Sequence, residues 1–156
     1  HQSVAIQDRE GARNELVMFI ERFGGTPHEA EARLLLGDLY LQDGSPQQAL
    51  AVLQPLGSTP GDPIEFQAAA LLGAAYEEEG RLGDAEATYI SIADRSDLDF
   101  QIRDALTAAA RIRAAQGDSQ GAVELYERVL EELDPESPQR GLYEMRIEEI
   151  ASTPNT

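Results

Sequence analysis

The sequence repeats itself at a spacing of 36 to 37 residues. The segment Leu34–Tyr40 (LLLGDLY) recurs 36 positions later as Ala70–Tyr76 (ALLGAAY). The same offset relates a glycine and an alanine that follow each copy: Gly44 to Gly80, and Ala49 to Ala85. A repeat of this length is one supersecondary unit that cannot bury its own apolar face, so its copies are expected to stack on one another.

Two weaker copies extend the register in both directions. Gly117, Ala122 and Tyr126 follow the second copy by 37 residues. At the other end, Ala12, Leu16 and Phe19 precede Ala49, Leu53 and Leu56 by 37. The helix before that early copy would require residues ahead of position 1, so we expect the chain to begin inside a repeat, with the partner helix missing or part of an upstream anchor.

The composition, together with residues typical of helix starts and turns, predicts that the repeat unit is helical. The chain has 22 Ala and 18 Leu against 5 Val and 9 Ile, a balance that favours helix over strand. Pro follows a capping residue at Thr26, Ser45, Asp62 and Ser137, which marks helix starts, and Gly44, Gly80 and Gly117 mark tight turns. Glu29, Gln48 and Glu65 are placed to reach back to the first three caps. The predicted helices span residues 9–23, 28–42, 46–57, 63–79, 83–95, 99–116, 119–133 and 137–151.

These residues resemble tetratricopeptide repeats, through Leu-Gly-x-x-Tyr in a first helix, glycine at the turn, and alanine with an aromatic residue in a second helix. The resemblance covers residues 10–135 and implies an all-α fold, a right-handed α-α superhelix. We expect one domain over residues 1–156, with a half-repeat at 9–25, repeats at 28–61, 63–97 and 99–134, and a capping helix at 137–151. Pro55 is expected to end its helix early. The capping helix is expected to cover the last pair with Leu142, Met145 and Ile150.

A narrower resemblance concerns the segment Phe19–Pro27 together with Glu31–Gly37, and the ending Leu142–Ile150. These are similar to bacterial cell-envelope members: outer-membrane assembly lipoproteins, the periplasmic cell-division coordinator and the ancillary subunit of the secretion translocon. That likeness favours a bacterial periplasm or cell envelope, with a signal or membrane anchor upstream of this chain, and the cytoplasm is the alternative.

Nine positions of the repeat are interpreted as structural, because small residues let helices approach and aromatic rings fill the gaps between layers. They are Gly37, Tyr40, Ala49, Gly73, Tyr76, Ala85, Tyr89, Ala122 and Tyr126. Apolar stripes at helical spacing complete the expected core, as in Ala32, Leu35, Leu36, Leu39 and Tyr40.

The family register also implies a concave groove lined by the first helix of each pair. Its predicted residues are Glu31, Leu34, Asp38, Leu41, Gln67, Ala70, Ala74, Glu77, Asp104 and Arg111. The mixture of Leu and Ala with carboxylates suits a protein or peptide partner, helical or extended, that carries basic residues. Each acidic residue taken singly is explained as well by a solvated face. Arg111 is the one basic residue of this set, so the clamp by which chaperone-binding relatives hold a terminal carboxylate is absent.

Charge and residue content narrow the function classes. Against 29 acidic residues the chain has 12 basic ones, all arginine, and the net charge of −17 would repel nucleic acid. The absence of lysine has two open explanations, coding bias and adaptation to high salt. The chain has no cysteine, no clustered histidines, no phosphate-binding loop, no nucleophile elbow and no apolar run that could span a bilayer. We therefore expect a non-catalytic interaction scaffold without cofactor or metal. The alternative is a self-assembling module, a homo-oligomer joined through an uncovered stripe with Val17 and Ile20.

Overall fold

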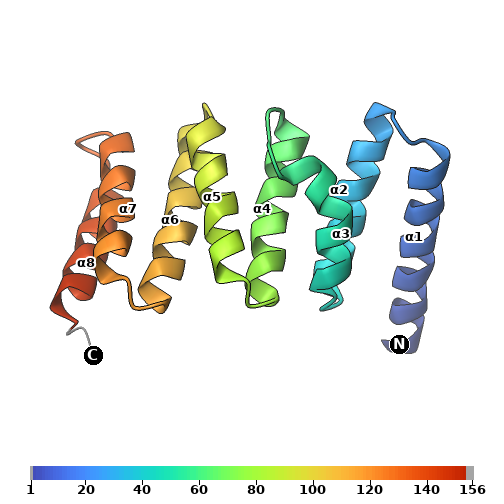
Figure 1. The fold of residues 1–156 in the computed structure, drawn as a ribbon, viewed down its shortest axis with the longest axis horizontal. Helices are drawn as coiled ribbons and strands as arrows, with labels where there is room; N and C mark the ends of the chain where they lie inside the picture. The colour runs from blue at the N-terminus through green and yellow to red at the C-terminus, as the bar shows by residue number, and fades with distance from the viewer. Residues whose placement is uncertain (1, 154–156) are drawn as a thin grey trace. The chain divides into compact units, whose positions relative to one another are not determined.

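The computed structural model describes the backbone of residues 2–153 and the side chains of residues 7–153, and in this part of the chain every regular element is an α-helix (Figure 1). The helices are α1 (Gln2–Arg22), α2 (Pro27–Gln42), α3 (Pro46–Gly57), α4 (Pro63–Glu78), α5 (Leu82–Arg95), α6 (Asp99–Ala115), α7 (Ser119–Glu132) and α8 (Arg140–Ser152). The all-α fold predicted from the repeat is confirmed.

Two helix starts differ from the prediction by more than one residue. Helix α1 begins at Gln2, although its repeat signal starts only near residue 9. Helix α8 begins at Arg140, because Ser137 and Pro138 belong to a turn in which the Arg140 N–H donates to the Ser137 carbonyl at 3.1 Å. The Ser-Pro signal therefore opens this turn instead of the helix itself.

The expectation that Pro55 ends its helix early is wrong, because α3 continues through Pro55 to Gly57. Proline interrupts a helix by removing one N–H donor and by crowding the carbonyl four residues earlier. Here Pro55 lies in the last turn of α3, so only the end of the helix is affected, where carbonyls need other donors. The hydroxyl of Ser58 supplies one of them, donating to the Gln54 carbonyl at 2.6 Å.

The capping prediction is confirmed for Asp62, whose Oδ1 accepts from the Glu65 N–H at 2.9 Å. Thr26 and Ser45 make no such bond, and the Thr26 hydroxyl donates instead to the Phe23 carbonyl at 2.6 Å. Glu29 does reach back, but to the residue before the cap. Its Oε2 accepts from the Gly25 N–H at 2.6 Å, so the carboxylate closes the loop that leads into α2.

The glycines between paired helices adopt the left-handed backbone that tight turns require. Gly44, Gly80 and Gly117 have φ values of 67°, 71° and 84°. Side chains disfavour this region, whereas glycine enters it at no steric cost. The sequence prediction for these three turns is confirmed.

Contacts divide the chain into two compact units, His1–Arg81 and Leu82–Thr156. The expectation of a single domain over residues 1–156 therefore stays a prediction. In the first unit α1 packs on α2, α2 on α3 and α4, and α3 on α4. In the second, α5 packs on α6, α6 on α7, and α7 on α8.

The close approach of helices in the first unit rests on two glycines. A Cβ built on Gly37 of α2 would lie 2.5 Å from Cγ and Cδ2 of Leu53 in α3. A Cβ built on Gly57 would lie 2.8 to 2.9 Å from the backbone of Ala68 and Ala69 in α4. Leu53, Ala68 and Ala69 are fully buried, so no spare volume exists at either contact.

The nine repeat positions interpreted as structural lie mostly inside the molecule. Eight of them are buried: Gly37, Ala49, Gly73, Tyr76, Ala85, Tyr89, Ala122 and Tyr126. Tyr40 is half-buried, and the guanidinium of Arg13 lies 5.9 Å above its ring. Arg13 and Arg9 of α1 also pair with Asp43 at the end of α2, which fastens the first helix of the described chain to its neighbour.

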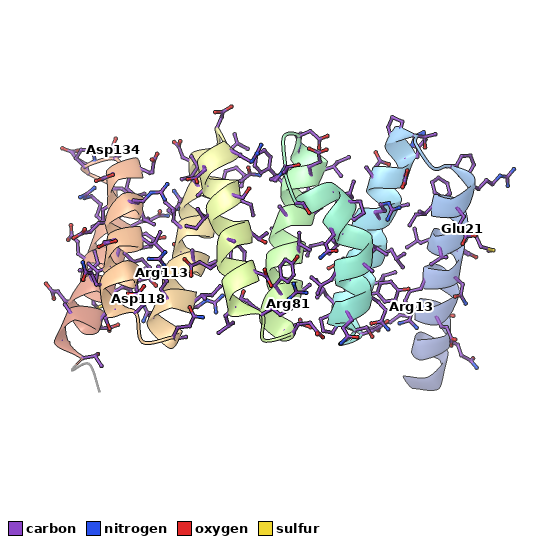
Figure 2. All side chains as sticks on the ribbon, in the orientation of Figure 1. Arg13, Glu21, Arg81, Arg113, Asp118 and Asp134 are labelled. Atoms are coloured by element: carbon purple, nitrogen blue, oxygen red, sulfur yellow. The ribbon has the colours of Figure 1, made fainter. Side chains whose placement is uncertain are left out.

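In the second unit, one arginine ties three elements together. Arg113 of α6, labelled in Figure 2 with Asp118, donates from Nε to Glu86 Oε1 of α5 at 2.7 Å and from Nη1 to Asp118 Oδ2 at 3.5 Å. The contact with Glu86 raises the pKa of the Arg113 guanidinium. Asp118 in turn caps α7, because its Oδ1 accepts from the Gly121 N–H at 2.9 Å.

Helix α8 turns a different face to α7 than the sequence suggests. Leu142 and Met145, expected to cover the last pair, are 51% and 50% exposed, whereas Tyr143 is buried and Ile150 half-buried. Arg140 is half-buried and donates to the carbonyls of Leu130 and Leu133. Helix α8 thus contacts the rest of its unit through Tyr143 and Ile150, and its first residue bonds to the end of α7.

Candidate partner-binding sites

A groove of about 370 Å³ lies between α2 and α4 in the first unit. Its lining residues come from the first helices of two consecutive pairs: Leu34, Leu35, Asp38, Gln67, Ala70 and Leu71. Four of the ten predicted groove residues, Leu34, Asp38, Gln67 and Ala70, therefore share one depression.

The floor of this α2–α4 groove is apolar and its polar groups are few. Leu34, Leu35, Ala70 and Leu71 supply the apolar surface. Asp38 supplies a carboxylate, whose Oδ2 accepts from Gln42 Nε2 at 2.7 Å. An apolar surface with one anchored anion can bury an apolar side chain of a ligand while pairing with a neighbouring cation.

The sequence assigned Leu35 to the core, and this expectation is wrong, because its side chain is 57% exposed. Successive helix residues are rotated by about 100°, and burial of Ala32 and Leu36 fixes which face of α2 meets α3. Leu35 is turned away from that face toward α4. Leu35 and Leu71 are thus groove residues that the family register did not identify.

The other four predicted residues of the first unit lie near this groove but do not line it. Glu31 is exposed on α2, one turn before Leu34, and Leu41 is half-buried. Ala74 and Glu77 are half-buried on α4. These positions extend the α2 and α4 surfaces on either side of the depression.

Of the two predicted residues of the second unit, only one lines a cavity. Asp104 is exposed, whereas Arg111 of α6 lines a cavity of about 380 Å³ that α6 and α8 enclose together with Tyr126 of α7. The remaining lining residues are Thr107, Ala114, Leu142, Tyr143, Arg146, Glu149 and Ile150. Arg146 therefore lines the same cavity as Arg111, which is the one basic residue of the groove predicted from the sequence.

A sequence signal for Arg146 existed. It follows Arg111 by 35 residues, close to the repeat spacing, so α8 occupies the register of a first helix. Treating residues 137–151 as a solvating cap left this helix out of the groove prediction.

The cavity between α6 and α8 is a charged one with a buried hydroxyl in it. Burial raises the pKa of the Tyr126 hydroxyl, and the positive charges of Arg146 and Arg111 act in the opposite direction by favouring the tyrosinate. Arg111, Arg146 and Tyr126 all line this cavity.

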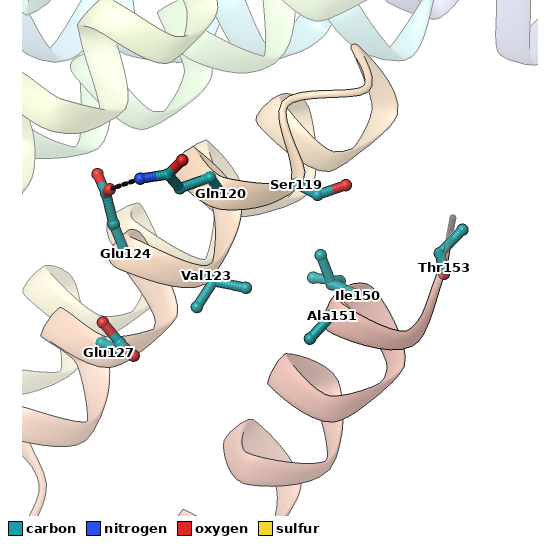
Figure 3. A pocket seen from close by; sticks show the side chains of 8 residues that line it. All are labelled: Ser119, Gln120, Val123, Glu124, Glu127, Ile150, Ala151 and Thr153. Atoms are coloured by element: carbon teal, nitrogen blue, oxygen red, sulfur yellow. Dashed lines mark hydrogen bonds between the residues drawn. The ribbon is translucent and has the colours of Figure 1, made fainter. Parts of the chain in front are cut away.

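A third and wider cavity of about 630 Å³ lies between α7 and α8 (Figure 3). Ser119, Gln120, Val123, Glu124 and Glu127 line it from α7, and Ile150, Ala151 and Thr153 from the end of the chain. Gln120 Nε2 donates to Glu124 Oε1 at 3.1 Å. None of the lining residues is basic, and the exposed carboxylates make it a solvated surface.

Among the described residues, no group of three or more His, Asp or Glu side chains is placed to hold a metal ion. No helix in the described range is both long enough and apolar enough to cross a membrane.

Two family models match the chain, both described as tetratricopeptide repeat, at residues 4–63 and 105–140. A crystal structure of nearly identical TPR-like repeats, assigned to a kinesin light chain of Podosopora anserina, superposes with a TM-score of 0.66. The two chains share 21% sequence identity, and the match covers 96% of this chain and 86% of the other. No curated protein matches this sequence at a significant level.

The fold is therefore that of an α-helical repeat protein, and residues 4–63 and 105–140 match tetratricopeptide repeats. Proteins built from these repeats generally act as scaffolds that bind other proteins, and the fold is typically non-catalytic. The resemblance to bacterial cell-envelope members finds no counterpart among these matches.

Proposed function

We propose that this protein is a non-catalytic interaction scaffold that binds a segment of a partner protein in the α2–α4 groove. The observation that carries the proposal is the exposed apolar floor of that groove, above all Leu35, between helices of two consecutive repeats. Clustered, exposed leucines do not stabilise a surface that faces water, whereas they are typical of a surface that binds a ligand.

The partner segment carries apolar residues and at least one basic residue. Leu34, Leu35 and Leu71 offer contact to an amphipathic helix or an extended strand, and Asp38 and the nearby Glu31 offer negative charge. The net charge of −17 adds a long-range attraction for a basic segment. Salt screens that attraction, so association should slow as ionic strength rises.

The test uses a photo-crosslinking amino acid in place of Leu35 in the native cell, with the same group in place of Leu98 as the control. Leu98 is also an exposed leucine but lies outside the groove. A partner crosslinked from residue 35 alone, at one mapped apolar and basic segment, supports the proposal. Crosslinks of equal yield and identity from both positions contradict it.

A substitution pair completes that test once the partner is purified. Leu35→Glu should abolish binding while leaving the unfolding transition unchanged, since the side chain is not part of the core. Leu98→Glu introduces the same charge and should bind normally. Equal binding by both variants would show that the α2–α4 groove is not the binding site.

We further propose that the scaffold works in a bacterial cell-envelope complex. The support is the sequence resemblance of Phe19–Pro27 with Glu31–Gly37, and of Leu142–Ile150, to envelope members of the repeat superfamily. Fractionation of the source cell tests it directly: recovery with the periplasm or membranes is expected, and recovery with the cytoplasm alone overturns it.

Self-assembly is the second candidate function, and exposed side chains of α1 favour it. Val17 and Ile20, the stripe expected to be uncovered, are half-buried, while Met18, Phe19 and Phe23 are exposed. The ring centroids of Phe19 and Phe23 lie 4.4 Å apart with the rings tilted by 37°, and the two side chains form an apolar patch. Sedimentation over a wide concentration range tests this candidate. A dimer that dissociates in Met18→Glu supports it, and a monomer at every concentration excludes it.

A further inference from the structure

Helix α1 has apolar residues on the face that meets α2 and also on a face that meets no other described helix. Leu16, Val17 and Ile20 are half-buried, and α1 packs on α2. Met18 and Phe19 are instead 61% and 36% exposed. A contiguous exposed apolar patch of this kind is typical of a surface that another molecule covers.

Two charged residues flank this apolar centre at equal spacing. Glu15 precedes Met18 by three residues, and Arg22 follows Phe19 by three. The four residues have the spacing i, i+3, i+4 and i+7, which places them on one side of a helix. All four line one depression of about 360 Å³, together with Phe23.

Neither charge has an ion-pair partner within the described part of the chain. The Glu15 side chain is exposed and makes no hydrogen bond or ion pair with any of residues 7–153. The Arg22 guanidinium lies 5.5 Å from the centroid of the Phe23 ring, in the last turn of α1, where a positive charge is favoured by the helix dipole. The carboxylate of Glu15 has no comparable contact, so the folded chain alone does not explain it.

A two-fold axis through the centre of this pattern would bring opposite charges together. In a two-fold symmetric contact the same surface is used by both copies, so every pair of residues forms twice. When two copies of α1 cross antiparallel at Met18 and Phe19, Glu15 of each copy lies opposite Arg22 of the other. Two ion pairs then flank an apolar centre in which Met18 of each copy meets Phe19 of the other.

We propose that two copies of this protein associate through α1 in this antiparallel arrangement, with reciprocal Glu15–Arg22 ion pairs that fix the register. The proposal rests on the self-assembly candidate above and specifies the surface, the symmetry and the register of that contact. The contact lies in the first compact unit, on a helix that does not line the α2–α4 groove.

The occupant is a second copy because one surface supplies both charges of the pair. A different protein would not require Glu15 and Arg22 to be equally spaced about the apolar centre, whereas a two-fold contact does. The interface uses one helix from each copy, and interfaces below about 1,200 Å² are typical of transient association. Two chains of net charge −17 also repel each other, although physiological salt confines this repulsion to about 8 Å. We therefore expect a weak dimer that is populated at about 1 mM protein.

The test is sedimentation equilibrium of the whole chain at physiological salt, over concentrations up to about 1 mM. Glu15→Arg and Arg22→Glu each replace two attractive pairs by two repulsive ones. Each variant alone should therefore dimerise at least about tenfold more weakly than the parent. Both side chains are exposed, so folding should be unaffected, and the amide spectrum of each variant checks this.

An equimolar mixture of the two variants tests the register itself. In a mixed dimer the new arginine of one copy faces the new glutamate of the other, and the remaining Arg22 faces the remaining Glu15. Both pairs are attractive again, so the mixture should dimerise within about threefold of the parent, although neither variant does so alone. The mean net charge stays at −17, because one substitution adds two positive charges and the other removes two. General repulsion therefore does not account for the recovery.

Glu21→Arg is the matched control for Glu15→Arg. Glu21, labelled in Figure 2, is exposed on the same helix but does not line the depression. This variant has the same change in charge and should dimerise as the parent does. A loss equal to that of Glu15→Arg would assign the effect to general charge and overturn the ion pair.

The remaining outcomes separate this contact from its alternatives. If Met18→Glu dissociates the dimer but the mixture does not restore it, α1 meets a different surface of the second copy. That result overturns the antiparallel arrangement and leaves self-assembly standing. A monomer at every concentration overturns both. Leu35→Glu, which alters the α2–α4 groove, should leave the dimer unchanged, so partner binding in the groove is tested separately.

Discussion

Leu53 of α3 occupies the space that any side chain at Gly37 of α2 would need, with its Cγ and Cδ2 only 2.5 Å from an added Cβ. Both residues are buried, and the two helices form one pair of the repeat. The glycine thus sets how closely α2 and α3 approach, and the leucine fills the space gained.

Gly37→Ala should destabilise the protein by about 1 to 3 kcal/mol, the usual cost of overpacking a core. Gly11→Ala is the control, because an added Cβ there meets nothing within 4 Å in the middle of α1. That change should stabilise by up to about 1 kcal/mol through helix propensity. Urea denaturation of the two variants should give opposite signs, and equal signs would contradict the contact.

The Gly37 effect should disappear when its obstacle is removed. Leu53→Ala alone should cost about 2 to 5 kcal/mol by leaving a cavity. Adding Gly37→Ala in that background should cost little, because the new methyl group enters the vacated space. A double-mutant cycle measures the coupling, and strict additivity of the two changes would mean that the residues do not touch.

Gly57→Ala should be more damaging than Gly37→Ala. The added Cβ would meet backbone atoms of Ala68 and Ala69, which cannot rotate away as a leucine side chain can. Helix α3 would have to move from α4, and the α2–α4 groove would change with it. The expected result is a loss of more than about 3 kcal/mol in unfolding free energy, the upper end of ordinary overpacking. A milder loss than that of Gly37→Ala would show that the α3–α4 contact is soft.

Gly44 tests backbone conformation without any steric contact. Its φ of 67° disfavours side chains, and an added Cβ meets nothing within 4 Å. Gly44→Ala should therefore cost about 1 to 2 kcal/mol, whereas Gly44→Asn should cost clearly less, since asparagine tolerates this region. Thermal denaturation of the two variants measures the difference, and equal costs would point away from backbone strain.

The stability of the loop before α2 should depend on acid. The Gly25 N–H, and then Arg33, lower the pKa of the Glu29 carboxyl below its ordinary 4.5. A lowered pKa in the folded state means that the contribution is present above pH 4.5 and is lost as pH falls through the folded value. NMR titration should find the Glu29 midpoint below 4.5, and Glu29→Gln should weaken the acid dependence of stability. Arg33→Gln should raise the midpoint only partly, because the larger cause remains.

The repeat register predicted much of the fold because it rests on features that act locally. Proline after a capping residue, glycine at φ above zero and alanine at close contacts each require only their own neighbours. Hence α2 to α7 begin and end within one residue of their predicted bounds. The rotation of a helix about its axis depends on all of its partners together, and there the prediction failed, at Leu35 on α2 and at Leu142 on α8.

The candidate sites show the same division. The family register places Leu34, Asp38, Gln67 and Ala70 on one face, and all four line the α2–α4 groove. Arg146 was left out because α8 was assigned the role of a cap that covers the last pair with its apolar residues. The positive charges in the cavity between α6 and α8 come from Arg111 of α6 and Arg146 of α8, so the sequence of one helix does not reveal them together.

Arg140 is the first residue of α8, and it also donates to the Leu130 and Leu133 carbonyls at the end of α7. The start of α8 and the end of α7 are therefore both held by the Arg140 side chain. Neither end can fray without releasing the other, so backbone amides in the last turn of α7 and the first turn of α8 should exchange with solvent in a single opening event. Through Arg140, two helix ends become one unit of local unfolding.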